Sequence, residues 1–289
     1  MQVVRPVHAP DGVGRCPGGS HVADGLEIDG VAVGVDAGVA TITLDRVDRK
    51  NAITIEMADA LAATIDGFRR DPEVRVVVLT GAGRAFCGGG DLGRIAEHRE
   101  PAEHRRRLVE HMHEVAFALE RFDKPVLAAV NGDAFGAGMD LALMCDIRFA
   151  ATSARFSDGY VLVGLVPGDG ACWFLPRIVG TSRALELLLT GDTIDAATAA
   201  ELGIVNHVVP DGALLAEVQA FAARLAARPP RIVEMIKRCL YESARSDLRT
   251  SLDLVASHMG IARSMPESAE ELARFHRERD ALRTASPSA

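Results

Sequence analysis

Two glycine-rich segments, each placed directly after an apolar run, decide the fold of this chain. The first reads GAGRAFCGGGDL (Gly81–Leu92) and follows the run Val74–Thr80. The second reads NGDAFGAGMDLALMCD (Asn131–Asp146) and follows the run Val126–Val130. Short apolar runs predict buried strands, and the glycines after each run predict a tight turn into a helix. A strand, a glycine-rich loop and a helix, used more than once, indicate an α/β protein with crossover connections.

The segments before these loops fit the same fold class. The runs Val31–Val35 and Val39–Leu44 alternate like the two strands of a hairpin, with a turn at Asp36-Ala37-Gly38 between them. Thr54 is expected to cap a helix whose apolar residues recur at spacings of four, four and three. Residues 1–25 are rich in glycine and proline and are predicted to be a disordered leader.

The C-terminal part is predicted to be helical. A long polar helix is expected over about 101–122, a third short strand over Asp146–Ala150, and an almost wholly helical pattern from Ser182 onward. The chain therefore divides into the leader, a sheet-containing core over 26–195 and a helical layer over 196–289. The helical layer carries apolar stripes in excess of what a small sheet could cover, which favours an oligomer.

Composition excludes several classes of function. The chain has 289 residues, with 32 Lys and Arg against 40 Asp and Glu, so its formal charge is −8 and a broad basic face for nucleic acid is not expected. Five scattered cysteines without a CxxC pair, and the absence of an apolar run of about 20 residues, predict a cytoplasmic protein without disulfides or a membrane span. Four histidines between residues 98 and 113 lack an HExxH spacing and are interpreted as a solvated face, not a metal site.

The two glycine-rich loops are the expected site of chemistry. A strand that turns into a helix leaves backbone N–H groups unpaired at the helix start, where the helix dipole favours negative charge. Neither loop contains GxGxxG or GxxxxGK[ST], which argues against a nucleotide-binding module, and no GxSxG supplies a nucleophilic serine. Tight packing turns would explain one such loop, but two of them favour a paired anion site.

At these residues the chain resembles the enoyl-CoA hydratase/isomerase (crotonase) family. The segments Val163–Gly170 (VGLVPGDG) and Leu185–Pro210 add to the resemblance, which runs from about Leu26 to the C-terminal helix. It implies a spiral of ββα units with a helical C-terminal trimerisation layer, assembled as a homotrimer or a dimer of trimers. It also implies an acyl-CoA substrate in fatty-acid or related metabolism, with no cofactor beyond the coenzyme A of that substrate, and no metal.

The resemblance places the two oxyanion-hole donors at the backbone N–H groups of Gly90 and Ala137. A CoA thioester that is deprotonated or attacked on its acyl chain passes through an enolate. Two fixed donors in a dry cleft stabilise the enolate oxygen, and each is worth about 3 kcal/mol. The resemblance also implies contacts to coenzyme A, for which the candidates are Arg49, Lys50, Ala52, Asp91, Leu92 and, from a neighbouring subunit, Arg279. For Arg49 and Lys50 the alternative is a solvated pair of loop charges.

The sequence departs from the family's hydratase pattern at two positions. A typical hydratase of the family has two glutamates, and Asp140 and Tyr160 stand at their positions here. Asp140 keeps the carboxylate but is one methylene shorter, and a tyrosine with an ordinary pKa near 10 is a poor general base. Hydration needs two groups that share one water, so classical hydration is in doubt.

Isomerisation needs fewer groups, because a single base can remove a proton from one carbon and return it two carbons along the chain. Asp140 is favoured as that base. Asp169 is the alternative, since it lies within one residue of the carboxylate of several isomerase-like members. Structural roles remain open for both, as a first-turn acid for Asp140 and a helix cap before Ala171 for Asp169. A catalytically weak acyl-CoA-binding member is the rival to an enzyme.

Overall fold

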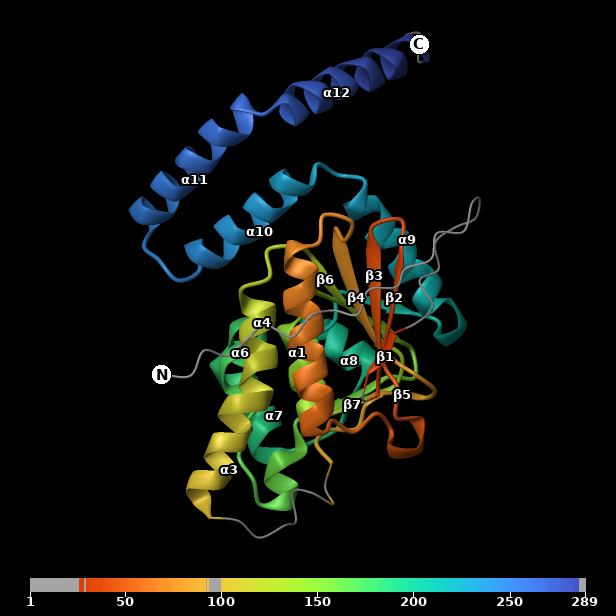
Figure 1. Ribbon diagram of the computed structural model, residues 1–289, viewed down its shortest axis with the longest axis vertical. Helices are drawn as coiled ribbons and strands as arrows, with labels where there is room; N and C mark the ends of the chain where they lie inside the picture. The colour runs from red at the N-terminus through yellow and green to blue at the C-terminus, as the bar shows by residue number, and fades with distance from the viewer. Residues whose placement is uncertain (1–25, 29, 92, 94–99, 286–289) are drawn as a thin grey trace, which may run out of the picture.

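The computed structural model describes residues 26–28, 30–91, 93 and 100–285, and the predicted leader lies outside these residues. Two sheets form the core (Figure 1). The larger has seven strands in the order β1-β2-β3-β4-β6-β8-β11, and the smaller has four in the order β10-β9-β7-β5. The strands of the large sheet are β1 (Leu26–Ile28), β2 (Val31–Asp36), β3 (Val39–Leu44), β4 (Val76–Gly81), β6 (Val126–Val130), β8 (Ile147–Ala151) and β11 (His207–Val209). Those of the small sheet are β5 (Ala85–Cys87), β7 (Asp133–Phe135), β9 (Arg155–Ser157) and β10 (Ile194–Asp195).

From β4 to β9, consecutive strands alternate between the two sheets. β4, β6 and β8 lie side by side and parallel in the large sheet, and each is followed by a short strand, β5, β7 or β9, in the small sheet. A helix follows two of these pairs, α5 (Ala137–Met144) after β7 and α6 (Ala171–Val179) after β9. The predicted spiral of ββα units is therefore confirmed, and it brings the two glycine-rich loops to one edge of the core.

The N-terminal elements form for the reasons that the sequence indicates. β2 and β3 pair antiparallel across a turn in which Ala37 and Gly38 both have positive φ, which is the geometry that matches the twist of a two-residue hairpin. Helix α1 (Ile55–Arg70) begins after Thr54, whose hydroxyl accepts a hydrogen bond from the N–H of Met57. The strand predicted to begin at Val74 begins two residues later in the structure, since β4 starts at Val76.

The core is built mostly from aliphatic side chains, together with the buried rings of Phe86, Phe122 and Phe156. β4 and β6 are buried along their full length, as expected for central parallel strands that are covered on both faces. α9 (Leu214–Ala226) packs against the large sheet, and α1 packs against α4 (His113–Glu120) (Figure 1). The remaining helices of this region are α7 (Thr181–Thr190) and α8 (Ala196–Glu201), with 3-10 turns η1 (Val47–Arg49), η3 (Gly159–Val163) and η4 (Asp211–Ala213).

The long polar helix contains a turn that the sequence analysis does not predict. It runs through α3 (Pro101–Arg107) and α4, but the five residues between them, η2 (Leu108–Met112), form one π-helical turn. A π turn inside an α-helix is uncommon and is found frequently at functional sites. This turn faces the loop before α6, since a Cβ added to Gly168 would lie 3.0 Å from the Leu108 side chain.

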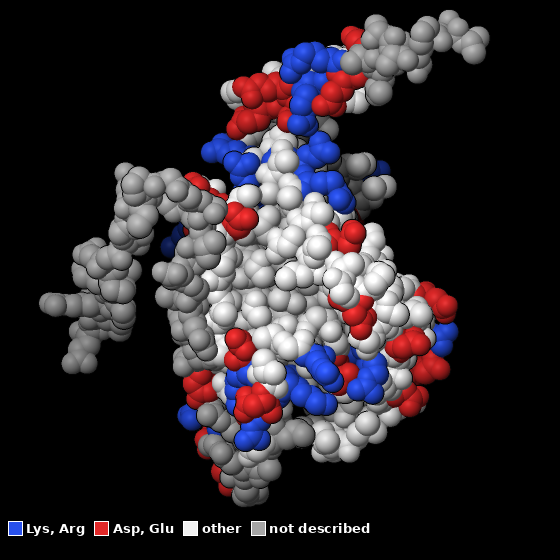
Figure 2. All heavy atoms as spheres, turned by 90° about the vertical axis from the view of Figure 1, so that its right-hand side faces the viewer, with Lys and Arg blue, Asp and Glu red and all other residues white. Residues whose placement is uncertain are grey.

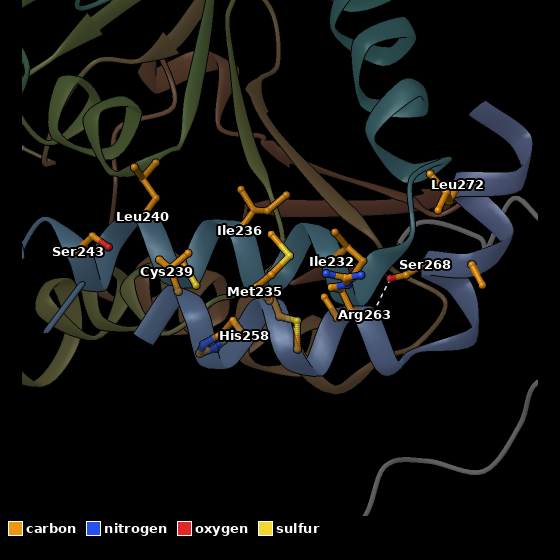
Figure 3. A pocket seen from close by; sticks show the side chains of 14 residues that line it. Ile232, Met235, Ile236, Cys239, Leu240, Ser243, His258, Arg263, Ser268 and Leu272 are labelled. Atoms are coloured by element: carbon orange, nitrogen blue, oxygen red, sulfur yellow. Dashed lines mark hydrogen bonds between the residues drawn. The ribbon is translucent and has the colours of Figure 1, made fainter. Parts of the chain in front are cut away.

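The last three helices leave the core. α10 (Pro230–Ser243), α11 (Leu248–Ser264) and α12 (Pro266–Ala285) follow α9, and α11 and α12 lie on the far side of α10 from the sheets (Figure 1). No residue of α10 or α11 is buried in the single chain. Their apolar side chains instead line a groove of about 850 Å³ that includes Ile236 and Met259 (Figure 3). β11 lies in the stretch that was expected to be helical, so the large sheet continues past residue 195.

The surface carries charges of both signs. On the face shown in Figure 2, Lys and Arg side chains lie among Asp and Glu side chains at the C-terminal helices and at the opposite end, and the middle of this face is largely uncharged. Among the described helices, none is at once long enough and apolar enough to cross a lipid bilayer.

Candidate active site

The two glycine-rich loops touch each other at the edge of the small sheet. A Cβ added to Gly138, in the first turn of α5, would lie 2.2 Å from the carbonyl oxygen of Cys87 at the end of β5. A Cβ added to Gly89 would lie 3.0 Å from the carbonyl oxygen of Phe135. The close approach of two backbones therefore explains glycine at these positions, and it sets Gly90 beside the N-terminus of α5.

Gly90 and Ala137 present backbone N–H groups at this junction. Gly90 is fixed by a parallel bridge in which the N–H of Ile53 donates to Gly89 O at 2.8 Å and the N–H of Asp91 donates to Ile53 O at 3.1 Å. Ala137 is the first residue of α5 and follows Gly136, whose φ is 49°. Within the part of the chain that the structure describes, neither the Gly90 N–H nor the Ala137 N–H donates a hydrogen bond. Both donors are therefore open to an oxygen atom of a ligand.

Asp140 lies one turn further along α5. Its side chain is fully buried, and neither carboxylate oxygen has a hydrogen-bond partner among the described residues. Burial raises the pKa of Asp140 well above its ordinary value, and the charges of Asp158 and Asp169 raise it further. A carboxyl with a raised pKa is a stronger base in its ionised form than an exposed aspartate.

Tyr160 and Asp169 form one hydrogen-bonded unit. The Tyr160 hydroxyl donates a hydrogen bond to Oδ2 of Asp169. Burial raises the pKa of Tyr160, so this hydroxyl stays protonated and acts as a donor. The Tyr160 ring lies 3.6 Å from the position that a Cβ on Gly136 would take, which places it beside the start of α5. Burial raises the pKa of Asp169, while the hydrogen bond from Tyr160 and the nearby His113 oppose that rise.

Sequence reasoning missed Asp158 and His113 at this site. Asp158 directly follows β9, is 1% exposed, and has no hydrogen-bond partner on either oxygen within the described residues. Burial and the charge of Asp169 raise the pKa of Asp158 to about 7. His113, expected on a solvated face, is only partly exposed, and its Nε2 lies 2.9 Å from the carbonyl oxygen of Gly168. His98, from the same set of histidines, lies outside the described residues.

No sequence signal distinguishes these two residues. Asp158 stands in the polar segment Ser157-Asp158-Gly159, which looks like an ordinary turn, and His113 is one of several polar residues on its helix. Their proximity to Asp140 and Asp169 depends on how β9, α5, α6 and the π turn pack together.

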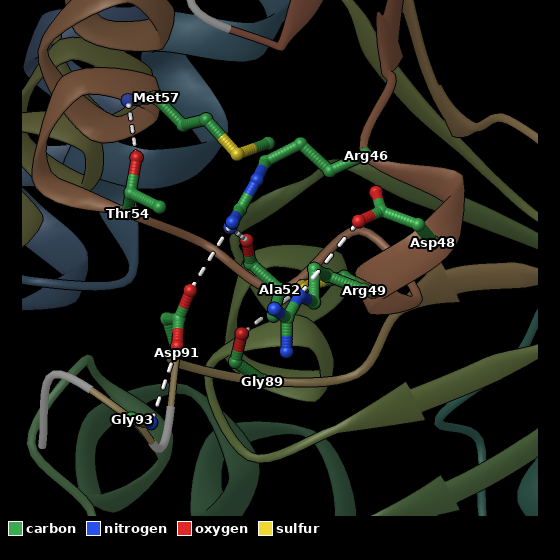
Figure 4. Close-up of polar contacts among 10 residues, drawn as sticks. Arg46, Asp48, Arg49, Ala52, Thr54, Met57, Gly89, Asp91 and Gly93 are labelled. Atoms are coloured by element: carbon green, nitrogen blue, oxygen red, sulfur yellow. Dashed lines mark hydrogen bonds and ion pairs between the residues drawn. The ribbon is translucent and has the colours of Figure 1, made fainter. Parts of the chain in front are cut away.

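The segment expected to meet coenzyme A is held by a network centred on Arg46, which the sequence analysis did not single out. Its guanidinium donates to the carbonyl oxygen of Ala52 at 2.6 Å and to Oδ2 of Asp91 at 3.2 Å (Figure 4). Arg49 and Lys50 project from this segment with side chains 67% and 69% exposed. Arg49 lies 3.7 Å from Asp48 (Figure 4), and Lys50 lies 3.6 Å from Asp133. Both cations are themselves exposed, so these ion pairs are weak.

The other expected coenzyme A contacts differ in their positions. Both backbone groups of Ala52 are already engaged, since its N–H donates to Arg49 O and its carbonyl accepts from Arg46. Leu92 lies outside the described residues. Arg279 lies on α12, away from the Arg46 segment in this chain (Figure 1), and its guanidinium pairs with Asp280.

A buried asparagine anchors this segment. Asn51 has a positive φ of 56°, and its side-chain amide donates to the carbonyl oxygens of Ala82 and Ala85 at 2.9 and 2.8 Å. The Arg46 segment is thereby tied to the first glycine-rich loop. In the described part of the chain, no group of three or more His, Cys, Asp or Glu side chains is arranged to hold a metal ion.

Comparison with known proteins agrees with this geometry. The model of the enoyl-CoA hydratase/isomerase family matches residues 34–281. The 1,2-epoxyphenylacetyl-CoA isomerase of Escherichia coli is 37% identical over 243 residues, which cover 83% of this chain and 93% of that protein. A probable enoyl-CoA hydratase of Rhodobacter capsulatus is 38% identical over 226 residues, with 78% of this chain and 86% of that protein covered. The crystal structure of an enoyl-CoA hydratase from Bacillus anthracis superposes with a TM-score of 0.83 at 30% identity, covering 86% of this chain and 97% of that one. The chain has the crotonase fold and is an enzyme of the enoyl-CoA hydratase/isomerase family.

Proposed function

We propose that this enzyme acts on the acyl chain of an enoyl-CoA thioester through an enolate, and that isomerisation of a double bond is its reaction. The observation that carries the proposal is the pair of unused N–H groups, Gly90 and Ala137, on two touching loops beside buried carboxyls. Two such donors stabilise the enolate oxygen by about 3 kcal/mol each.

Asp140 is the proposed acid–base residue. It lies three residues after Ala137, on the same face of α5, so its carboxyl is directed toward the carbons next to the polarised carbonyl. In the proposed step, Asp140 removes a proton from the α carbon, the C–H electron pair moves into the enolate, and the same proton returns to the γ carbon. Asp169 is the alternative base, and its hydrogen bond from Tyr160 stabilises the ionised form.

Isomerisation is favoured over hydration because Tyr160 does not replace the missing glutamate as a base. Its hydroxyl is a donor to Asp169, so Tyr160 does not act as the proton acceptor here. The Escherichia coli relative is named 1,2-epoxyphenylacetyl-CoA isomerase, and this name supports an isomerase reaction on a CoA thioester. Hydration remains the second candidate, since other relatives are named probable hydratases.

Coenzyme A is proposed to bind over the Arg46 segment. Arg49 and Lys50 are exposed cations that suit its phosphates, and Asp91 contributes by holding Arg46 in place. Arg279 is proposed to reach the coenzyme of a neighbouring subunit in a homotrimer or a dimer of trimers. The unburied apolar faces of α10 and α11 support such an assembly.

A panel of 2-enoyl-CoA and 3-enoyl-CoA thioesters tests the proposal. Turnover of 3-enoyl-CoA without net addition of water is expected, and Asp140→Asn should lower kcat by roughly 10² to 10⁴. Asp192→Asn, which changes an exposed carboxyl, is the matched control and should retain activity. Full activity of Asp140→Asn together with an inactive Asp169→Asn would move the base to Asp169. Binding of every thioester without turnover would instead make the chain a catalytically weak acyl-CoA-binding member.

A further inference from the structure

Three aspartates from different elements converge behind the two N–H donors. Asp140 comes from α5, Asp158 follows β9, and Asp169 precedes α6. The backbone brings them together, because β7 pairs with β9 and the N–H of Gly136 donates to Ser157 O at 2.8 Å. Within the described residues, five of their six carboxyl oxygens are buried without a hydrogen-bond partner.

These three carboxyls cannot all be ionised at once. Like charges in a site shielded from water repel strongly, so at least one of the group holds a proton over the neutral range. The hydrogen bond from Tyr160 stabilises charge on Asp169, and no cation pairs with Asp140 or Asp158 in the described structure. At least one proton is therefore held by the pair Asp140 and Asp158.

We propose that Asp158 is a positioning residue of the acid–base site, whose carboxyl shares a proton with Asp140 and thereby determines when Asp140 is ionised. The two carboxyls form a pair in which ionisation of one keeps the other protonated, as in other buried carboxylate pairs. In the proposed reaction, Asp140 loses its proton beside ionised Asp158 as the pH rises, and it then takes a proton from the α carbon and gives it to the γ carbon. The effect of Asp158 on catalysis rests on the proposed function. The sharing of a proton between Asp158 and Asp140 does not depend on that function.

The groups that face Asp158 come from every neighbouring element. They are Asp140 of α5, Asp169 before α6, Cys172 in the first turn of α6 and Tyr160 of η3, while His113 reaches only Asp169. Burial raises the pKa of Asp158 to about 7, and the charge of Asp169 adds to that rise. Asp158 is the largest source of charge repulsion on Asp140.

Cys172 supplies a reporter that needs no substrate. This free cysteine is exposed, and its thiol pKa is raised by partial burial and then by the charges of Asp158 and Asp140. Its rate of alkylation by iodoacetamide, followed peptide by peptide as a function of pH, therefore measures negative charge at the cluster, because the thiolate is the reacting form.

The experiment compares Asp158→Asn with Asp192→Asn in the full chain. Asp158→Asn should lower the apparent pKa of the Cys172 thiol by roughly half a unit or more, and Asp192→Asn should leave it unchanged. With a 3-enoyl-CoA substrate, the acid limb of the kcat/KM profile should move to lower pH by roughly one unit, because Asp140 ionises more easily without a charged neighbour. Asp158→Ser serves as the second variant if the asparagine does not fold.

The two readouts separate the two proposals. An unchanged Cys172 thiol and an unchanged acid limb in Asp158→Asn would overturn the shared proton even if Asp140 proves essential. A shifted thiol in a protein without turnover on any enoyl-CoA would uphold the shared proton and overturn the proposed function. A shifted thiol with a fixed acid limb would show that Asp158 does not act on the catalytic carboxyl, which also overturns the inference.

Discussion

Tyr160 occupies the position at which a typical hydratase of the family has a glutamate, yet it remains part of the site. Its ring packs beside Gly136, next to the proposed donor at Ala137, and its hydroxyl donates to Asp169. A hydroxyl in place of a carboxylate changes a base into a donor. This residue therefore replaces one ionisable acid by a group that stabilises another acid in its charged form.

Tyr160→Phe should remove this stabilisation and keep the ring packing. A hydrogen bond to a charged group contributes about 1.5 to 3 kcal/mol, so the pKa of Asp169 should rise by roughly one unit or more. The charged form of Asp169 would then appear only at higher pH. This shift can be measured by infrared titration of the carboxyl groups in the wild type and in Tyr160→Phe, with the spectrum of Asp169→Asn used to assign the Asp169 band. A titration of Asp169 that is the same in Tyr160→Phe as in the wild type would contradict the role given to the hydroxyl.

Asp158 should also make folding stability depend on pH. Its pKa is raised to about 7 in the folded protein from an ordinary 3.8, so the folded state binds this proton more tightly. The resulting stabilisation is fully present below pH about 4 and is lost as the pH rises through about 7, which amounts to roughly 4 kcal/mol. Urea unfolding at fixed protein concentration, at about pH 5 and about pH 8, should show a larger loss in the wild type than in Asp158→Asn. Equal losses of unfolding free energy in the wild type and in Asp158→Asn would contradict the raised pKa of Asp158.

The sequence identifies some residues of this site more readily than others. Gly90 and Ala137 act through the backbone, and the glycines that permit close approach mark these positions in the sequence. Asp158, His113 and Arg46 are placed by contacts between elements that are distant along the chain, and nothing in their local sequence distinguishes them from solvated residues. Residue type and spacing therefore predict the donors, whereas the packing of β9, α6 and the π turn determines which charged groups surround them.

At the scale of elements, the approach of α5 to β5 depends on one side chain being absent. The Cβ of an alanine at position 138 would lie 2.2 Å from the carbonyl oxygen of Cys87, a distance that the backbone cannot accommodate without moving. The helix that carries Ala137 and Asp140 is therefore positioned by glycine at its second residue.

Gly138→Ala should displace the start of α5 and lower kcat/KM at least tenfold, because geometry within an active site must hold to well under 1 Å. Gly67→Ala is the matched control. That glycine lies on α1 with nothing within 4 Å of an added Cβ, so alanine should raise the unfolding free energy by about 0.5 to 1 kcal/mol and leave activity unchanged. Steady-state kinetics and thermal unfolding of both variants test this prediction. A fully active Gly138→Ala would show that glycine at position 138 does not position α5.

Local sequence patterns predict those helices and strands that have a clear cap or a regular run of apolar residues. α1 has a cap and a regular apolar stripe, and β6 has the bounds that its apolar run predicts. β11 is only three residues long, and its place in the large sheet depends on pairing with β8, so its own sequence does not reveal it. The π turn is likewise determined by contacts outside its helix.

At the scale of the whole molecule, the apolar side chains of the helices beyond α9 are not covered by other parts of the single chain. Ile236 and Met259 are 64% and 58% exposed in the single chain, and both line the groove formed by α10, α11 and the start of α12. Figure 3 shows Ile236 in this groove. Contiguous apolar surface of this kind usually marks an interface. It supports the proposed assembly of several copies of this chain.

Met259→Glu should weaken that assembly, because it places a charge where apolar side chains are expected to pack. Sedimentation velocity at micromolar concentration should show trimers or hexamers for the wild type and smaller species for the variant. Arg228→Glu, which changes an exposed residue outside the groove, should leave the distribution unchanged. A wild-type chain that sediments as a monomer would rule out the assembly itself.

The π turn at Leu108–Met112 has a consequence for how this chain tolerates insertions and deletions. A π turn holds one residue more than the α-helical turn that it replaces, so deleting one residue there can restore a regular α-helix. The helix would survive such a deletion, but every residue on its N-terminal side would rotate by about 100° and shift by about 1.5 Å. Leu108 would then leave Gly168 while His113 stayed in place. The extra residue therefore sets which face of α3 meets the loop before Asp169, and a one-residue deletion here should change that contact without unfolding the helix.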